Sequence, residues 1–260
     1  MARARAAALQ ALEIDPDLPE AHAALAVVKQ VFEWDFAAAE REYLRSIELM
    51  PNDAWPYRHY ARMLLALGRL EEAAEVYRMS QEVDPHSIDS TPFGLPELYV
   101  MEGKESEALA DLERALELEP HYYVPHLNLG NHYCRRGDTD LALPYLQRAV
   151  ELSPDDPIVS ANLAYCLARS GNPSEARKLL GEIEAFLEDA YVDPVVLALV
   201  HVGLGENERA IEWMEKGYAA RALNLLEVGA DSRFDPLRSD PRFSDLLQRI
   251  GLPTLPRKAG

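Results

Sequence analysis

The stretch that decides the fold runs from Pro125 to Pro154 and reads PHLNLGNHYCRRGDTDLALPYLQRAVELSP. Gly137 separates two segments of helical character, so the stretch predicts two antiparallel helices joined by a tight turn. Pro154 ends the second segment, because a proline disfavours helical backbone in the residue before it. Ala142 and Leu146 lie one turn apart on a single face of the second segment, where a small side chain lets the two helices approach. The stretch therefore predicts one helix pair.

The same unit recurs along the chain at a period of 34 or 35 residues. Turn glycines, small alanines and closing prolines each keep this register, which is the pattern of a repeat protein whose core lies between neighbouring units. The three series are Gly68, Gly103, Gly137, Gly171 and Gly205; Ala39, Ala73, Ala108, Ala142, Ala176 and Ala210; and Pro16, Pro51, Pro85, Pro120 and Pro154. Agreement of the three registers predicts a solenoid of helix pairs.

The unit resembles the tetratricopeptide repeat, and the resemblance covers nearly the whole chain. It implies an all-α fold, an α-α superhelix (solenoid) of antiparallel helix pairs with a C-terminal capping helix. We expect a single solenoid domain over residues 1–260. Its expected parts are a lone second helix in 1–17, repeats at 18–51, 52–85, 86–120, 121–154 and 155–190, a divergent repeat at 191–220 and a C-terminal cap at 221–260.

Three places depart from the regular unit. The residues Phe32–Phe36 stand where a turn glycine is expected, so we predict an altered turn there. The first helix of the 86–120 repeat contains prolines at Pro92 and Pro96, which predict a kink or a late start because proline breaks a helix interior. Near the end, Asp240 is the expected N-cap of a terminal helix that Gly251 stops.

Two stretches, Trp34-Asp35 and Phe234–Phe243, resemble the repeat region at the C terminus of bacterial signalling proteins. In those proteins the repeats follow a winged-helix DNA-binding domain, a Ser/Thr kinase domain or a nucleotide cyclase domain. The resemblance implies a regulatory module of a larger protein. Because the chain begins inside a repeat, we expect it to be the C-terminal piece of such a protein, with the upstream domain unidentified.

Composition narrows the class of partner and the compartment. Lys and Arg number 26 against 44 Asp and Glu, and the formal net charge of −18 opposes binding to nucleic acid or to an anionic membrane. No apolar run is long enough to cross a membrane and no signal peptide is recognisable, so we expect a cytoplasmic protein. Cys134 and Cys166 form no CxxC motif, which favours two free thiols in a reducing compartment.

A search for catalytic or metal-binding motifs finds none. The chain lacks HExxH, GxxxxGK[ST], GxSxG and GxGxxG, and Gly203 and Gly205 are explained by a repeat turn. His126 and His132 fall on different sides of one helix, which is unsuitable for a shared metal. We therefore predict no enzyme, no cofactor and no metal. A small-molecule sensor, with a pocket near Pro92 to Pro96, is the alternative, and an enzyme is the less favoured third reading.

In the resembled family the first helices of the pairs line a concave groove. Residues of these helices that face away from their own second helices include arginines, asparagines and aromatic side chains, although the whole chain is acidic. The candidate partner-binding residues are Trp55, Arg58, Arg62, Tyr99, Asn128, Asn131, Arg135, Asn162, Tyr165 and Arg169. Because arginine forks bind carboxylates, we expect a peptide or protein partner with an acidic or C-terminal carboxylate segment. Its identity and the oligomeric state stay open.

Three pairs of these candidates are equivalent in adjacent units, 34 residues apart: Arg135 with Arg169, Asn131 with Tyr165, and Asn128 with Asn162. We expect each pair to lie side by side in the groove, and the family resemblance implies that the last pair bonds the backbone of an extended peptide. A structural alternative stays open. The asparagines could bond only within the stack, and the arginines could pair with neighbouring glutamates.

Overall fold

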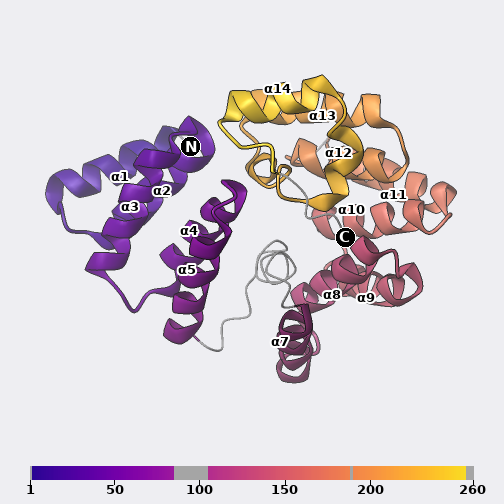
Figure 1. Cartoon of the computed structure of the whole chain (residues 1–260), viewed down its shortest axis with the longest axis horizontal. Helices are drawn as coiled ribbons and strands as arrows, with labels where there is room; N and C mark the ends of the chain where they lie inside the picture. Colours follow the sequence, from indigo (N-terminus) through magenta and orange to yellow (C-terminus); the bar gives the residue numbers. More distant parts are fainter. Residues whose placement is uncertain (1, 85–104, 188–189, 256–260) are drawn as a thin grey trace. The chain divides into compact units, whose positions relative to one another are not determined.

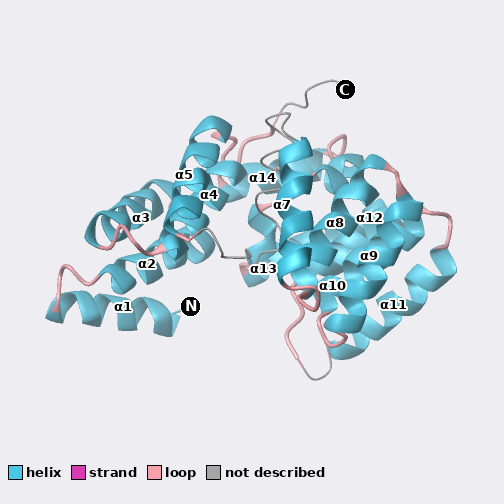
Figure 2. Ribbon diagram, turned by 90° about the horizontal axis from the view of Figure 1, so that it is seen from below, coloured by secondary structure: helices cyan, strands magenta, loops and turns pink. Residues whose placement is uncertain are grey.

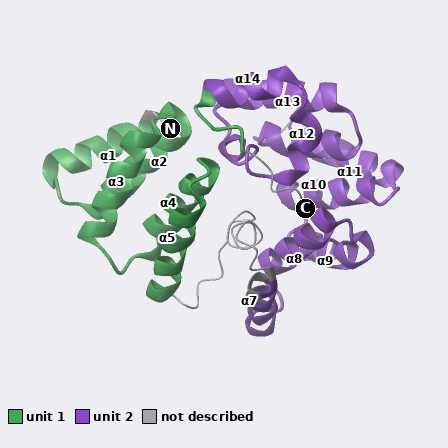
Figure 3. Ribbon diagram, in the orientation of Figure 1, with its two compact units in different colours: residues 1–87, 250–260 green, residues 88–249 purple. Residues whose placement is uncertain are grey.

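The structure is a computed structural model that describes residues 2–84, 105–187 and 190–255 (Figure 1). All regular structure in these ranges is helical, which confirms the predicted all-α class. The helices form two compact units, residues 1–87 with 250–260 and residues 88–249 (Figure 3). Each unit is described by itself.

Unit 1 begins with α1 (Ala2–Ile14), the predicted lone second helix. Two helix pairs follow it, in which each helix packs on the next along the chain. Tyr43 and Leu64 lie in the core between them, with no exposed surface. The elements after α1 are α2 (Pro19–Val27), the π-helix η1 (Val28–Glu33), α3 (Phe36–Leu49), α4 (Ala54–Ala66) and α5 (Leu70–Val83).

The altered turn predicted at Phe32–Phe36 is present in unit 1. The α2 helix widens into the π-helix η1, and Trp34 then takes the left-handed conformation with φ 57°. At Gly68, Gly137, Gly171 and Gly205 glycine supplies that conformation, because it has no Cβ to clash. The carboxylate of Asp35 accepts a hydrogen bond from the backbone N–H of Ala38 at 2.9 Å and so begins α3.

Unit 2 contains α7 and the helix pairs from α8 to α13, which are among the helices drawn in cyan in Figure 2. Gly137, Gly171 and Gly205 have φ values of 84°, 86° and 75° and make the turns inside three pairs. Pairs also pack on one another, since α10 contacts α8 and α12. The helices are α7 (Glu105–Leu118), α8 (Tyr123–Arg136), α9 (Thr139–Leu152), α10 (Pro157–Arg169), α11 (Pro173–Phe186), α12 (Pro194–Gly203) and α13 (Asn207–Ala220).

The C-terminal cap follows α13 and keeps the repeat register. Its helix α14 (Pro241–Ile250) begins where Asp240 accepts a hydrogen bond from the N–H of Arg242 at 2.9 Å, as predicted. Arg242 pairs with Glu208 of α13 at 2.9 Å and lies 34 residues after it, so α14 takes the place of a further second helix. Two 3₁₀ helices, η2 (Leu223–Leu226) and η3 (Ser232–Leu237), stand where its first helix would be.

The kinked helix expected around Pro92 and Pro96 lies outside the described residues, as does the candidate Tyr99. Because the chain divides into two compact units at residues 87 and 88, the arrangement of all repeats as one domain stays a prediction.

Candidate partner-binding site

The candidate residues lie on three first helices, one in unit 1 and two in unit 2. Trp55, Arg58 and Arg62 are in α4 of unit 1. In unit 2, α8 carries Asn128, Asn131 and Arg135, and α10 carries Asn162, Tyr165 and Arg169. The two units present these side chains in different ways.

In unit 1 the candidates share one side of α4 with a histidine. Trp55 is 38% exposed, and its ring centroid lies 4.0 Å from that of His59, one helical turn along. Arg58 and Arg62 are partly exposed and, three and seven residues after Trp55, lie on the same side of the helix. We call Trp55, Arg58, His59 and Arg62 the α4 patch. His59 was missed in the sequence, although its spacing from Trp55 could have revealed it.

The α4 patch is electropositive. Burial, followed by the charges of Arg62 and Arg58, lowers the pKa of His59 to about 3, so the imidazole is neutral at physiological pH. Positive charge on the histidine would add to that of two neighbouring guanidinium groups. The same arrangement favours an anion placed against the patch, because it would offset their repulsion.

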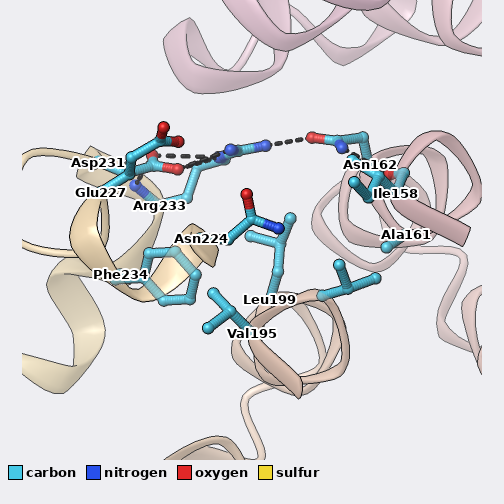
Figure 4. A pocket seen from close by; sticks show the side chains of 11 residues that line it. Ile158, Ala161, Asn162, Val195, Leu199, Asn224, Glu227, Asp231, Arg233 and Phe234 are labelled. Atoms are coloured by element: carbon cyan, nitrogen blue, oxygen red, sulfur yellow. Dashed lines mark hydrogen bonds and ion pairs between the residues drawn. The ribbon is translucent and has the colours of Figure 1, made fainter. Parts of the chain in front are cut away.

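In unit 2 the candidate side chains are mostly buried. Asn131 is 2% and Asn162 1% exposed, and Asn128 and Tyr165 are also buried. Asn131, Asn162 and Tyr165 are contacted from within the unit by the connection between α13 and α14, which brings Arg233 against α8 and α10. Figure 4 shows Asp231 and Arg233 of this connection beside Asn162 of α10. We call Asn131, Arg135, Asn162 and Tyr165 the seat.

Asp231 and Arg233 form a buried ion pair. The Nη2 and Nε atoms of Arg233 donate hydrogen bonds to Asp231 Oδ2 at 2.6 and 2.8 Å, and its backbone N–H donates to Oδ1 at 3.0 Å. Only 3% of Asp231 and 2% of Arg233 are exposed. Charges buried to this degree require close pairing, because they have lost the solvation of water.

The remaining donors of Arg233 reach the seat. Its Nη1 atom donates to Asn162 Oδ1 and, at 3.4 Å, to Asn131 Oδ1. The guanidinium also lies 5.9 Å from the ring centroid of Tyr165, within the range of a cation–π interaction. On the other side of the pair, Arg135 Nε lies 3.6 Å from Asp231 Oδ1. The seat therefore contacts both charges of the pair.

Electrostatics at the seat are dominated by guanidinium groups. Burial alone would raise the pKa of Asp231, but the charges of Arg233 and Arg135 outweigh it and hold the pKa at about 2. A hydrogen bond with Cys166 and the charges of Arg233, Arg135 and Arg169 lower the pKa of the Cys134 thiol despite burial. The charges of Arg135 and Arg169 therefore both act on the Cys134 thiol.

Both cysteines are free and buried. The hydrogen bond with Cys134, together with burial, raises the pKa of the Cys166 thiol.

Asn162 also bonds inside its own helix, since its Nδ2 atom donates to the carbonyl of Ile158 at 2.7 Å. The amide nitrogen of Asn162 therefore bonds within its own helix, while its amide oxygen accepts a hydrogen bond from Arg233.

Asp231 and Arg233 were not predicted as site residues. Both belong to a connection without a regular first helix. Arg233 lies 71 residues after Asn162 and 102 residues after Asn131 in the sequence. The repeat register contained a usable signal, because 102 residues are three repeats and Arg233 is therefore equivalent to Asn131 and Tyr165. From this position the Arg233 side chain bonds Asn162 of α10 and Asn131 of α8.

A small cavity lies beside the ion pair (Figure 4). Its volume is about 20 Å³, which is room for roughly one water molecule. Its apolar walls come from α10, α12 and Phe234, and polar side chains form the rest of the lining. The apolar residues of the two helices are Ile158, Ala161, Val195, Val196 and Leu199, and the polar residues are Asn162, Asn224, Glu227, Asp231 and Arg233.

The described residues contain no group of three or more His, Cys, Asp or Glu side chains that could hold a metal ion. Within the same ranges, none of the helices combines the length and the apolar character needed to cross a bilayer. Glu206 contacts the ring of the buried His201 at 2.8 Å and pairs with Arg177 at 2.6 Å, and these contacts link α11, α12 and the start of α13.

Comparison with known proteins identifies the repeats. Family models described as tetratricopeptide repeat match residues 35–88 and 133–200. The chain carries tetratricopeptide repeats. Proteins built from them are in general scaffolds for other proteins and not catalysts, because the stacked helices supply extended surfaces. Among curated proteins, none matches this repeat chain.

Solved structures of other repeat proteins share the fold. A tetratricopeptide repeat protein from Parabacteroides merdae is 15% identical, with a TM-score of 0.60 over 95% of this chain and 91% of that one. A chain of the APC/C hetero-tetramer Cut9-Hcn1 is 16% identical, with a TM-score of 0.58 over 95% of this chain. A chain of the human IFIT1 dimer with m7Gppp-AAAA is 19% identical, with a TM-score of 0.59 over 96% of this chain. The repeat chain spans 45% of the Cut9-Hcn1 chain and 62% of the IFIT1 chain.

Proposed function

We propose that the chain holds a peptide or protein segment on the inner side of its first helices and that this segment carries carboxylates. The observation that supports the proposal most directly is the α4 patch, where two arginines and a neutral histidine follow a partly exposed tryptophan along one side of the helix. Tryptophan and arginine are the residues that most often anchor a partner at an interface. The patch offers both in a chain whose net charge is −18.

The chemistry of the patch favours a carboxylate over other anions of a protein. A guanidinium group presents two parallel N–H donors that match the two oxygens of a carboxylate. Arg58 and Arg62 lie one helical turn apart, so they suit two acidic side chains, or one side chain and a C-terminal carboxylate. Trp55 would pack on an apolar residue beside them.

We also propose the candidate residues of unit 2 as part of the partner-binding surface, on the condition that the segment covering them moves aside. Asn128, Asn131, Arg135, Asn162, Tyr165 and Arg169 were chosen for equivalent positions on α8 and α10. Asp231 and Arg233 cover the seat, so a segment reaches Asn131 and Asn162 only if that pair moves aside. The α4 patch is the part of the proposed surface to test first.

The wider setting is also proposed. The residues Trp34-Asp35 and Phe234–Phe243 resemble the repeat regions of bacterial signalling proteins, which supports a regulatory module in the cytoplasm. The m7Gppp-AAAA in the IFIT1 structure is a ligand of that protein, and we do not extend it to this chain. The net charge of −18 makes nucleic acid an unfavourable partner here.

A pair of labelled peptides tests the proposal. The acidic probe is fluorescein-GELEGLEE with a free C terminus, the control replaces each glutamate with glutamine, and fluorescence anisotropy measures Kd. We expect the acidic probe to bind more tightly, with affinity falling as salt rises, since surface charges are screened. Arg58→Ala with Arg62→Ala should weaken binding at least tenfold, or about 1.4 kcal/mol.

The matched control is Arg78→Ala, which removes an exposed arginine of α5 that pairs with Glu75. This variant should bind the acidic probe as the unaltered chain does. Equal affinity for the two peptides, or an unchanged Kd in the double variant, would overturn the proposal.

A further inference from the structure

The segment after α13 contains two Asp-x-Arg-Phe elements, at Asp231–Phe234 and Asp240–Phe243. They have the same internal geometry. In the first, the backbone N–H and Nη2 of Arg233 lie 3.0 and 2.6 Å from oxygens of Asp231, and in the second the same atoms of Arg242 lie 2.9 and 2.6 Å from oxygens of Asp240. The element therefore forms from its own residues, whether or not the seat surrounds it.

Their surroundings differ. Arg242 has 47% of its side chain exposed at the start of α14, whereas Arg233 has 1% exposed and reaches Asn131 and Asn162. The buried copy is held by polar contacts to α8 and α10, which lie far from it in sequence. It sits on the first helices as a short bound peptide would, with its carboxylate at Arg135 and its guanidinium at the asparagines.

The fit of this internal copy is incomplete. Asn131 is 2% exposed, and its Nδ2 donor has no hydrogen-bond partner among the residues that the structure describes. A buried donor without an acceptor is unfavourable, so a segment with one more acceptor at this place would be held more strongly. The cavity of about 20 Å³ borders the same ion pair and leaves room next to it.

We infer that the seat is a binding site for a segment with a carboxylate and a guanidinium two residues apart, that the chain's own Asp231–Phe234 fills it here, and that a partner segment of this chemistry takes its place. The inference concerns unit 2 and does not depend on the proposed role of the α4 patch. It assigns the ligand both charges, where the sequence alone suggested only an acid.

A variant without the internal copy tests the inference. Asp231→Ser with Arg233→Met removes both charges, while serine can still cap η3 and methionine retains the apolar stem of arginine. The probe is a fluorescein-labelled ADSRF peptide, which copies residues 230–234. We expect it to bind this variant at least tenfold more tightly than the unaltered chain, in which the seat is filled.

Three comparisons establish specificity. A probe with asparagine in place of aspartate should bind at least tenfold more weakly. Adding Arg135→Ala to the variant should also reduce affinity at least tenfold. The matched control, Asp240→Ser with Arg242→Met, removes the exposed copy of the element and should bind no better than the unaltered chain. The inference would be overturned by a folded variant that does not bind the ADSRF probe more tightly than the unaltered chain does. Equal affinity for ADSRF and for its asparagine analogue would also overturn it.

A measurement on the unaltered chain covers the case in which the double variant does not fold. Millimolar ADSRF peptide should speed amide hydrogen exchange at residues 228–237, because the displaced segment loses its protection. Exchange at residues 240–243 should stay the same. Unchanged exchange at residues 228–237 with saturating peptide would contradict displacement.

Discussion

Arg135 Nε lies 3.6 Å from Asp231 Oδ1, an oxygen that also accepts a hydrogen bond from the backbone N–H of Arg233 at 3.0 Å. A carboxylate with almost no exposed surface thus meets two guanidinium groups, one from α8 and one from its own 3₁₀ segment. Low local polarizability strengthens such attraction, but removing three charges from water opposes it. The strength of the cluster is therefore measured by removing one member.

Asp231→Asn should destabilise unit 2 by about 3 kcal/mol, because it removes the buried negative charge that the guanidinium groups of Arg233 and Arg135 approach. The shape and the N-cap are retained, since asparagine caps a helix as well as aspartate does. Urea unfolding followed by circular dichroism measures the free energy of unfolding. Asp240→Asn changes the exposed copy of the same element and should cost much less, because exposed ion pairs contribute little to stability. Equal losses in the two variants would exclude a special role of burial.

The same carboxyl group should make unit 2 sensitive to acid. The pKa of Asp231 is about 2 in the folded chain against 3.8 ordinarily, so the folded state favours the ionised form. Its contribution to stability is complete above pH 3.8 and is lost as pH falls toward 2, where the folded state must also take up the proton. Urea midpoints measured from pH 5 to 2 should fall less steeply in Asp231→Asn. Parallel curves would show that another group causes the acid response.

The repeat pattern predicted most of the fold because its physical requirements are local. Gly137 and Gly171 supply left-handed turns, and Asp240 and Gly251 bound the last helix, so each helix end can be identified from a few neighbouring residues. The turn at Trp34 was predicted as altered, but its π-helical form depends on how η1 packs and was not predictable from spacing.

The contents of the seat could not be predicted in the same way. The sequence placed Asn131, Arg135 and Asn162 on one surface and assigned them a carboxylate ligand. It did not show that Asp231 and Arg233 of the same chain lie there, because that contact depends on an irregular connection and not on a repeated helix. Periodicity locates a surface, whereas its occupant depends on packing between distant segments.

His59 should make unit 1 less stable below neutral pH. Burial and the two arginines of the α4 patch lower its pKa to about 3 from 6.5, so between these values the unfolded chain binds a proton that the folded chain does not. The free energy of unfolding therefore falls as pH decreases from 6.5 toward 3. His59→Gln should flatten this slope. Titration of the His59 ring by NMR provides the direct check, and a midpoint near 6 would contradict the expectation.

Binding of an acidic peptide at the α4 patch should raise the pKa of His59, since a carboxylate favours the protonated ring. The NMR titration of His59 with and without the GELEGLEE probe measures the change. We expect a higher midpoint in the complex and no change with the glutamine control. A midpoint that does not move while the acidic probe is bound would place the peptide elsewhere on the chain.

Two glycines within helices of unit 2 should respond to alanine with opposite signs. A Cβ at Gly130 of α8 would lie 2.5 Å from Leu146 Cγ and 3.2 Å from the Leu146 backbone nitrogen, and Leu146 has no exposed surface into which it could move. Gly130→Ala should therefore force α8 and α9 apart at a cost of about 1–3 kcal/mol.

At the exposed Gly181 of α11 a Cβ would meet nothing within 4 Å among the described residues. Gly181→Ala should stabilise the unit by about 0.5–1 kcal/mol, because alanine loses less backbone entropy in a helix. Urea unfolding of both variants compares the two effects, and stabilisation by Gly130→Ala would show that α8 and α9 are not in close contact at this glycine.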